Sequence, residues 1–373
     1  IFDFTSSHPL VSPYYTTTYT LVETNTVTGC SNSNSVTIVA NQVISLTVTP
    51  SEQTICSGDN TNITITSNIS GTVFTWEPTL TVGNPATTTG YSDGTGPLIN
   101  QIISNVSGAA SSISYLIKAT ADECENRDFT AVVHINPEPV VNNQSATLCS
   151  DIPSGITLGN STNGVPIVSY TIESINANGL TASAGNPLTG AGFGANEISD
   201  DAWTNTTTNP VNVIYTIRPI SSANCAGDAF SVTMTINPEP QVTNPTAYEI
   251  CSGGSTGITL TSTIPSSFQW TIDNITGGIT GATPGSGSSI NQMLTNPSNS
   301  LPGSVEYIVT PRSTSGTCFG NPVTITVTVN PGPVVTNAPT LRICSGSSTG
   351  ITLTASTTAS FTWTIGAITG GIT

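Results

Sequence analysis

Eight cysteines recur along the chain in two classes, and their thiols could form covalent cross-links. In one class cysteine follows Ile or Leu and precedes Ser, with separations of 93, 102 and 93 residues (149−56, 251−149, 344−251): Cys56, Cys149, Cys251 and Cys344. In the other it lies in a small polar loop, with separations of 94, 101 and 93 residues (124−30, 225−124, 318−225): Cys30, Cys124, Cys225 and Cys318. Regular cysteines without a CxxC motif favour disulfides and an oxidising compartment. Zinc is disfavoured, because the two histidines, His8 and His134, do not recur with the repeat.

Two pairings of these cysteines fit the spacing. Our prediction joins the classes within one repeat, which closes long loops and stabilises each repeat by about 4 kcal/mol through the unfolded state: Cys56–Cys124, Cys149–Cys225 and Cys251–Cys318. Its difficulty is that an immunoglobulin-like topology places the two classes near opposite ends of the domain. The alternative joins each loop cysteine to the first-class cysteine of the next repeat, over even gaps of 26, 25, 26 and 26 residues (56−30, 149−124, 251−225, 344−318). Even gaps also follow if the last strand and the linker are constant in length.

Cys30 and Cys344 have no mate in their own repeats, so we expect the chain to be part of a longer protein.

The other recurring large side chains are aromatic. Trp76, Trp270 and Trp363 lie 20, 19 and 19 residues after a first-class cysteine (76−56, 270−251, 363−344), and Tyr170 lies 21 residues after one (170−149). Recurrence on a strand predicts core residues, like the buried tryptophan of immunoglobulin folds; the alternative is a platform for stacking sugars. Trp203 takes the place of an aliphatic residue in the sister repeats and is also predicted to be core.

Two groups of acidic residues could bind calcium, which prefers oxygen ligands: Asp122, Glu123, Glu125 and Asp128, and then Glu197, Asp200 and Asp201. Neither group recurs, so we interpret both as surface acids and expect no cofactor, with calcium as the alternative. His134 is replaced by Thr in the sister repeats, so it is expected to face solvent rather than act in catalysis. Asn-x-Ser/Thr sequons are attributed to composition: Asn62, Asn68, Asn105, Asn143, Asn160, Asn205 and Asn274.

Short strands separated by Gly and Pro turns must position these residues. Each repeat opens after a proline pair at residues 137–139, 238–240 or 331–333. A strand alternating apolar residues with Thr follows the first cysteine, as in residues 258–261, and then come an aromatic strand, a strand beginning near Tyr115, Tyr215 or Tyr307, and a last strand ending in Asn. Period-two alternation without helical periodicity predicts an all-β tandem array of immunoglobulin-like sandwiches with an elongated shape.

The composition excludes several partners. Five basic residues against 21 acidic ones give a net charge of −16, which cannot neutralise a phosphate backbone and disfavours anionic lipid. No apolar stretch approaches about 20 residues, so we expect no insertion into a membrane.

The Ile-Cys-Ser-Gly run, the Trp strand, the YTIRP or YIVTP strand, the Cys-x-Gly loop and the closing INPEP or VNPGP resemble PKD-like and immunoglobulin-like repeats of Bacteroidetes cell-surface proteins. Such repeats are typical of SprB-type gliding-motility adhesins and other type IX secretion cargo. The cysteine and proline period divides the chain into a partial repeat, three whole repeats and a partial repeat: residues 1–45, 46–137, 138–238, 239–331 and 332–373. The resemblance implies that the first of these is an immunoglobulin-like repeat and the others are PKD-like or immunoglobulin-like.

The resemblance implies a non-catalytic stalk in a secreted adhesin filament on the bacterial surface, associated with the outer membrane and serving adhesion and gliding. Its expected partners are extracellular surfaces or glycans, and anchoring and gliding machinery reached through regions outside these residues. One alternative is a module that binds glycans or cells through exposed loops. Another is the stalk of a secreted polysaccharide-degrading enzyme.

Overall fold

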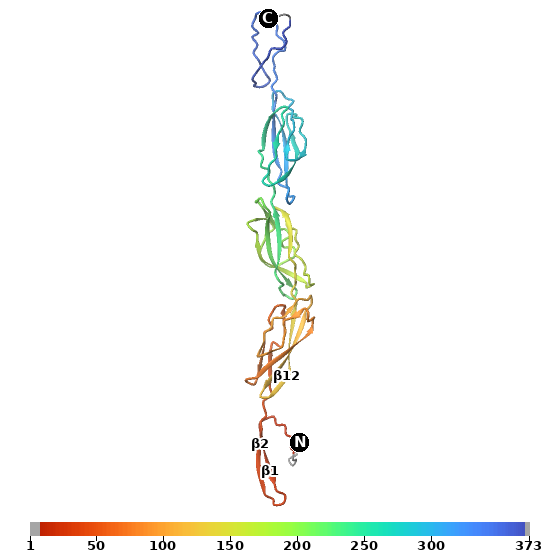
Figure 1. Cartoon of the computed structure of the whole chain (residues 1–373), viewed down its shortest axis with the longest axis vertical. Helices are drawn as coiled ribbons and strands as arrows, with labels where there is room; N and C mark the ends of the chain where they lie inside the picture. The colour runs from red at the N-terminus through yellow and green to blue at the C-terminus, as the bar shows by residue number, and fades with distance from the viewer. Residues whose placement is uncertain (1–7, 370–373) are drawn as a thin grey trace.

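The chain folds into three β-sandwich domains arranged end to end along one long axis (Figure 1). The computed structural model describes residues 8–369, without the side chains of residues 127 and 128. All regular secondary structure in this part of the chain is β-strand. The prediction of an elongated all-β tandem array is therefore confirmed.

The first domain contains a five-stranded sheet in the order β4-β12-β11-β6-β8 and a three-stranded sheet in the order β3-β5-β9. Short strands β7 and β10 form a further pair. Residues Ile63–Ser67 alternate between buried and exposed, as the Ile-Thr pattern requires of a strand that faces a core on one side. The strands are β3 (Leu46–Thr49), β4 (Glu52–Cys56), β5 (Ile63–Ser67), β6 (Val73–Val82), β7 (Thr88–Thr89), β8 (Gly94–Thr95), β9 (Leu98–Ile99), β10 (Ser104–Asn105), β11 (Ser111–Ala121) and β12 (Cys124–Asn136).

The second and third domains repeat this five-stranded sheet, in the orders β13-β19-β18-β14-β16 and β20-β26-β25-β22-β23. The second domain has β13 (Gln144–Cys149), β14 (Ile167–Asn176), β15 (Thr181–Ala184), β16 (Gly190–Phe193), β17 (Ala202–Thr204), β18 (Val211–Ser221) and β19 (Phe230–Asn237). The third has β20 (Ala247–Cys251), β21 (Ile258–Thr259), β22 (Ser266–Ile275), β23 (Gly285–Ser286), β24 (Ser289–Ile290), β25 (Gly303–Ser313) and β26 (Val323–Asn330).

One pairing recurs in all three domains and fixes the positions of the cysteines. The strand that ends in a first-class cysteine lies parallel to the last strand of its own domain: β4 with β12, β13 with β19, and β20 with β26. Because the two strands run in the same direction, both end on the face from which the chain leaves the domain. Cys56 is in register with Asn136, Cys149 with Asn237, and Cys251 with Asn330.

Each domain has its own hydrophobic core. Tyr115, Tyr215 and Tyr307 are fully buried in the three cores. Each tyrosine Oη donates a hydrogen bond to a side chain of its own domain: to Gln101 at 2.8 Å, Asp201 at 2.6 Å and Gln292 at 2.9 Å, respectively. Separate cores mean that the domains are joined only through their short junctions.

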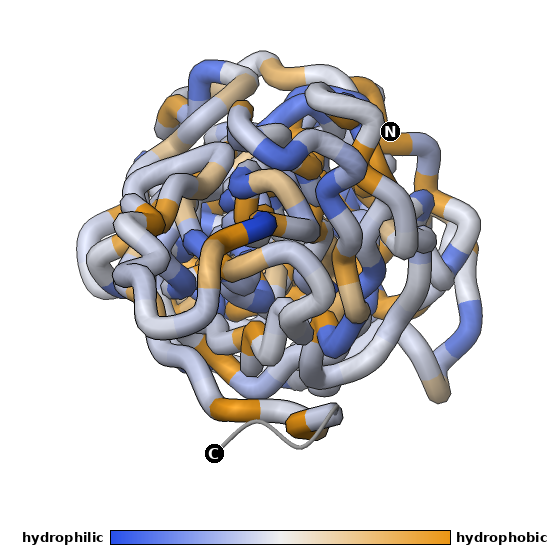
Figure 2. The backbone as a smooth tube through the Cα atoms, turned by 90° about the horizontal axis from the view of Figure 1, so that it is seen from above, coloured by the Kyte–Doolittle hydropathy of each residue, from blue (hydrophilic) through white to orange (hydrophobic). Residues whose placement is uncertain are grey.

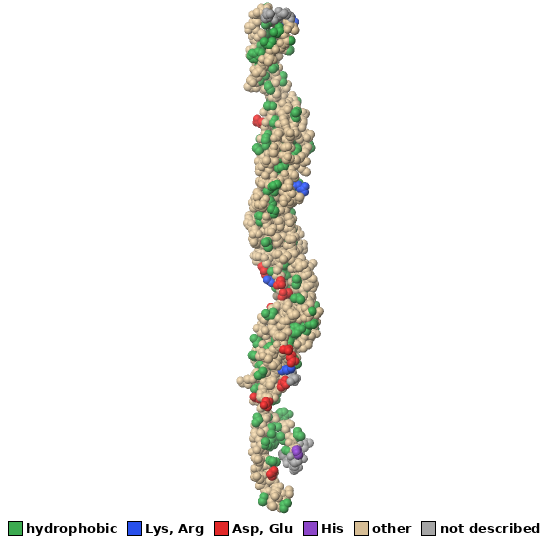
Figure 3. Space-filling model, viewed as in Figure 1, with side chains coloured by type: hydrophobic (Ala, Val, Ile, Leu, Met, Phe, Trp, Pro, Cys, Tyr) green, Lys and Arg blue, Asp and Glu red, His purple; other side chains and the backbone are tan. Residues whose placement is uncertain are grey.

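The ends of the chain form less structure. The hairpin of β1 (Thr17–Thr24) and β2 (Ser31–Ile38) is largely exposed, and the part of residues 332–369 beyond the third domain has one isolated bridge, between Val335 and Ala355. Seen along the long axis, the tube stays within one rounded outline (Figure 2). Charged side chains are sparse on the face drawn in Figure 3.

Candidate functional site

Two disulfides join neighbouring domains, and they define the candidate site. Cys56, at the end of β4, is bonded to Cys225 in the hairpin between β18 and β19 of the second domain. Cys149, at the end of β13, is bonded to Cys318 in the corresponding hairpin of the third domain. Both bonds span 169 residues of sequence. Each therefore links the exit face of one domain to the entry face of the next.

The structure corrects the predicted connectivity. Neither the pairing within one repeat nor the alternative over 26 residues is formed; Cys124 and Cys251, both predicted to be bonded, are free, as are Cys30 and Cys344. Cys124 begins β12, whereas Cys56 lies beside the far end of that strand. The 12 residues between them (136−124) extend about 40 Å at about 3.3 Å per residue, whereas disulfide-bonded Cα atoms lie within about 7 Å.

The loop that carries the second cysteine is shaped to accept the linker between the domains. A Cβ atom at Gly227 would lie 2.0 Å from the carbonyl oxygen of Pro139, and one at Gly320 would lie 1.7 Å from that of Pro240. Only glycine lets the linker backbone approach so closely. The glycine of the Cys-x-Gly motif is thus required by the junction, and the prolines at both ends of each Pro-Glu-Pro linker are buried there.

The serine after each first-class cysteine ties that cysteine to a buried asparagine of its own domain. Ser57 Oγ accepts a hydrogen bond of 2.9 Å from the backbone N–H of Asn105, and the same bond links Ser150 to Asn205 and Ser252 to Asn296, also at 2.9 Å. All three asparagines are buried. Each donates to the carbonyl oxygen of a last-strand residue, as Asn296 does to Val329 at 2.8 Å. The position of the cysteine is therefore held by hydrogen bonds that link its neighbouring serine to the asparagine and the asparagine to the last strand.

The linker glutamates add charge to the junctions. Burial raises the pKa of Glu138, the negative charges of Asp228 and Asp59 raise it further, and the Arg218 guanidinium opposes them. Glu239 occupies the equivalent place in the next linker, where burial and then the charge of Asp151 raise its pKa. Arg218 also donates from Nε to Glu173 at 2.6 Å and from a terminal nitrogen to the Gly227 carbonyl at 2.7 Å.

The recurring aromatic residues lie mostly in the cores. Trp76, Tyr170 and Trp270 are 5%, 3% and 7% exposed, and Trp203 is buried with its ring edge-on to Tyr215. Trp363, by contrast, is 79% exposed. Its predicted core position is wrong in this structure, because the described residues after 331 form no sheet that could cover it.

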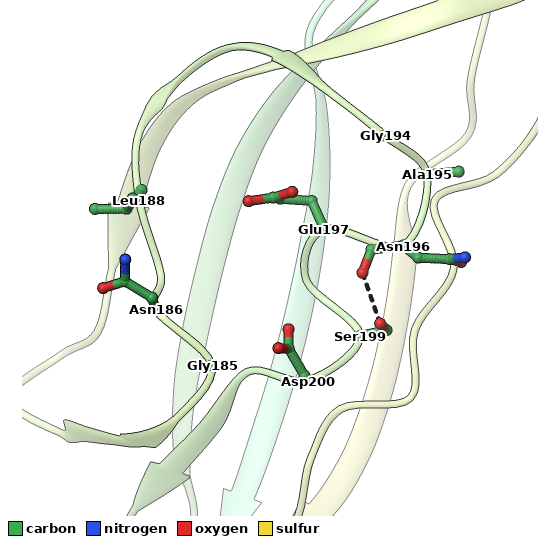
Figure 4. Close-up of a pocket in the computed structure, with 9 residues that line it drawn as sticks. All are labelled: Gly185, Asn186, Leu188, Gly194, Ala195, Asn196, Glu197, Ser199 and Asp200. Atoms are coloured by element: carbon green, nitrogen blue, oxygen red, sulfur yellow. Dashed lines mark hydrogen bonds between the residues drawn. The ribbon is translucent and has the colours of Figure 1, made fainter.

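The second acidic group divides between a surface hollow and the core. Glu197 and Asp200 line a shallow hollow of about 650 Å³ in the second domain, together with Asn186 and Leu188 (Figure 4). Asp201 instead turns into the core toward Tyr215. Among the described residues, no group of three or more His, Cys, Asp or Glu side chains could hold a metal ion; the side chain of Asp128, which belongs to the first acidic group, lies outside the described residues. The hollow lies in a loop that makes this repeat longer than its sisters.

His134 takes part in a small polar network on the sheet. Its Nδ1 lies 2.7 Å from Ser112 Oγ, and its Nε2 lies 3.1 Å from Glu52 Oε1. The ring is partly exposed, as replacement by Thr in sister repeats predicted. These contacts link three neighbouring strands, because Glu52 lies on β4, His134 on β12 and Ser112 on β11.

These features define a tandem β-sandwich protein whose neighbouring domains are covalently joined. The chain belongs to the PKD-like domain family: the family model matches residues 53–139, 146–240 and 248–333, together more than half of the chain. A search of curated proteins found no match. The disulfides and the domain type indicate a secreted or surface protein. Within residues 8–369 no helix is long and apolar enough to cross a membrane.

Several solved structures show weak similarity to the chain. The I67–I69 fragment of titin is 10% identical, with a TM-score of 0.33, over 78% of this chain and 98% of that one. The FN1–FN3 domains of chicken CNTN1 are 12% identical, with a TM-score of 0.26, over 73% and 95%. SGBP-B of Bacteroides ovatus, solved with a mixed-linkage heptasaccharide, is 13% identical, with a TM-score of 0.16, over 82% and 75%. These scores are too low to support a functional argument.

Proposed function

We propose that the chain is a non-catalytic stalk segment of a large secreted adhesin on a bacterial surface, and that it serves adhesion and gliding. The observation that carries the stalk role is the pair of disulfides between neighbouring domains. A stalk must keep its length and direction, and covalent bonds across each junction restrict bending. The adhesin and gliding roles rest on the resemblance of the repeat motifs to those of surface filaments.

Buried linkers support the same role. Flexible connections between domains are usually exposed and rich in Gly or polar residues. Here the linker prolines at 137, 139, 238 and 240 are buried between domains, and Asn163 of the second domain donates a hydrogen bond of 2.8 Å to the carbonyl oxygen of Glu138. Each junction is therefore a packed contact.

Small-angle X-ray scattering of the purified chain tests the stalk role. We expect the profile of a straight rod in oxidising buffer. Substituting both Cys56 and Cys225 with Ser should broaden the distance distribution, because the first junction gains freedom to bend. Substituting Cys251 with Ser provides the control, since that thiol is unbonded. A flexible string of domains in the oxidised chain would contradict the stalk role.

A binding module is the second candidate, and the hollow in the second domain is the observation that favours it. Carboxylates, amide groups and an apolar side chain, which line it in Figure 4, suit a polar ligand such as a glycan. A glycan array probed with the whole chain tests this candidate. Signal that is lost in the Glu197→Gln/Asp200→Asn variant would favour binding over a purely structural stalk.

A further inference from the structure

The two disulfides create continuous extended routes through the domains, and we propose that these routes make the array inextensible under tension. Path A is defined as residues 46–56, the Cys56–Cys225 bond and residues 225–251. Path B is defined as residues 124–149, the Cys149–Cys318 bond and residues 318–330. Each path crosses a domain along its first or last strand and passes to the next domain through a disulfide or a linker.

Both paths are already close to full extension. A path needs about 12 residues to cross a domain, and strand residues rise about 3.3 Å each, so each crossing covers about 40 Å. A fully extended chain gains little over this, at about 3.3–3.6 Å per residue. Tension along either path therefore cannot lengthen a domain appreciably.

Force must nevertheless pass from one path to the other. The backbone enters the first domain on path A, at residue 46, and leaves the third domain on path B, at residue 330. The paths lie side by side as the three parallel strand pairs: β4 with β12, β13 with β19, and β20 with β26. Their hydrogen bonds cross the direction of pull, so tension shears the two strands of each pair past one another.

The disulfides couple these three strand pairs mechanically. In a chain without disulfides the domains are loaded in series, and each unfolds when its own pair fails. With both disulfides, path A cannot slide past path B in one domain unless it slides in all three. The pairs therefore share the load and must fail together.

The sequence spacing fits this arrangement. The stretches from a loop cysteine to the next first-class cysteine, such as Cys225 to Cys251, hold 26, 25, 26 and 26 residues (56−30, 149−124, 251−225, 344−318). The repeats themselves differ by nine residues, 93 against 102, and the additional residues lie in loops off both paths. Two parallel paths that both carry tension need equal lengths, since the longer one would otherwise be slack.

This inference deepens the proposed stalk role, because inextensibility under tension matters only where the segment carries load. Its test is separate from that of the stalk role. Scattering measures the shape without load, whereas pulling measures the load path. If scattering shows a rod but pulling unfolds one domain at a time, the stalk role stands and the inference of shared load is wrong.

Single-molecule pulling of residues 1–373 between marker domains provides the test. Reduced protein should show three unfolding events, each releasing roughly 250–300 Å of chain at about 3.5 Å per residue. Oxidised protein should show one event at higher force. That event releases about 200 Å, because the shortest covalent route then runs through the 76 residues between Cys149 and Cys225 (225−149).

Variants that lack one disulfide test which path carries the tension. The Cys56→Ser/Cys225→Ser variant should show one unfolding event, which releases the roughly 250–300 Å of chain expected for a single domain. That domain is the first one, because path B still connects the second and third domains covalently and prevents their extension. Cys149→Ser/Cys318→Ser should leave one such event from the third domain. Cys251→Ser is the matched control and should behave like the oxidised parent chain. Three separate events in that parent chain, with both disulfides verified by mass, would overturn the proposal.

Discussion

Cys56 lies in register with Asn136, the last residue of β12, so the first-class cysteine and the departing chain share one face of the domain. The loop cysteine of the same domain, Cys124, begins β12 and lies at the opposite end. This relationship directs each cysteine toward a neighbouring domain. It also explains why the bonded cysteines come from different repeats.

Thiol labelling tests the connectivity directly. Alkylation of the unfolded, unreduced chain should modify four cysteines: Cys30, Cys124, Cys251 and Cys344. Reduction before alkylation should raise the number to eight. Peptide mapping should recover cross-linked peptides that contain Cys56 with Cys225 and Cys149 with Cys318; a Cys56–Cys124 peptide would contradict the structure.

Substitution of the junction glycines should weaken the contacts between domains. Gly227→Ala places a methyl group against the Pro139 carbonyl, and Gly320→Ala does the same at Pro240. We expect each to cost about 1–3 kcal/mol, the usual penalty for overpacking, and thermal melts to show it. Gly332→Ala is the control, because no atom lies within 4 Å of its Cβ position. An unchanged melting temperature in Gly320→Ala would contradict this prediction and would mean that the linker backbone shifts to accommodate the methyl group.

The sequence predicted the strands and cores well because both depend on local alternation. Alternating Ile and Thr, the recurring tryptophans and the Tyr strand each determine which side of a strand is buried. The disulfide pairing depends instead on β4 lying parallel to β12, a contact between distant segments that spacing does not encode. The available clue was that the two cysteine classes fall at opposite ends of an immunoglobulin-like domain.

The buried asparagines were missed although they recur. Asn105, Asn205 and Asn296 lie 10, 10 and 11 residues before the buried tyrosines (115−105, 215−205, 307−296). Two of them belong to Asn-x-Ser/Thr sequons, which were attributed to composition. Their fixed spacing distinguishes them from the surface asparagines and could have identified them as structural.

Removing one of these asparagines should destabilise its domain. Asn296 donates to the carbonyl oxygens of Leu301 at 2.9 Å and Val329 at 2.8 Å and accepts from the Ser298 N–H at 2.8 Å. Asn296→Ala leaves these groups without the side chain, so we expect a loss of about 2–3 kcal/mol in chemical denaturation. Asn274→Ala, at an exposed sequon of the same domain, should change stability by less than about 0.5 kcal/mol. Equal effects would mean that Asn296 is not structural.

Asp201 should make the second domain less stable as pH rises. Burial raises the pKa of Asp201, and the charges of Asp200 and Glu197 raise it further, against a hydrogen bond from Tyr215. Below an unfolded pKa of about 4, both states are protonated and the penalty is absent. It grows as pH rises from there to the folded pKa and is constant above it. Asp201→Asn should therefore gain stability over the parent chain at pH 7 relative to pH 3. Denaturation at both pH values, with the exposed Asp273→Asn as control, measures this; a pH-independent difference would contradict it.

The buried tryptophan of the third domain offers the largest expected effect from a single side chain. The Trp270 ring packs against Gly285, where a Cβ atom would lie 2.7 Å from the ring, and its Nε1 donates to the Thr283 carbonyl at 3.2 Å. Trp270→Ala empties this site, so we expect a loss of about 3–5 kcal/mol. Trp363→Ala is the matched control, because that ring is 79% exposed. Thermal melts of the whole chain should show the third domain unfolding earlier in the first variant and no shift in the second. A change of less than about 1 kcal/mol in Trp270→Ala would place its ring outside the core, because such a small effect is typical of surface positions.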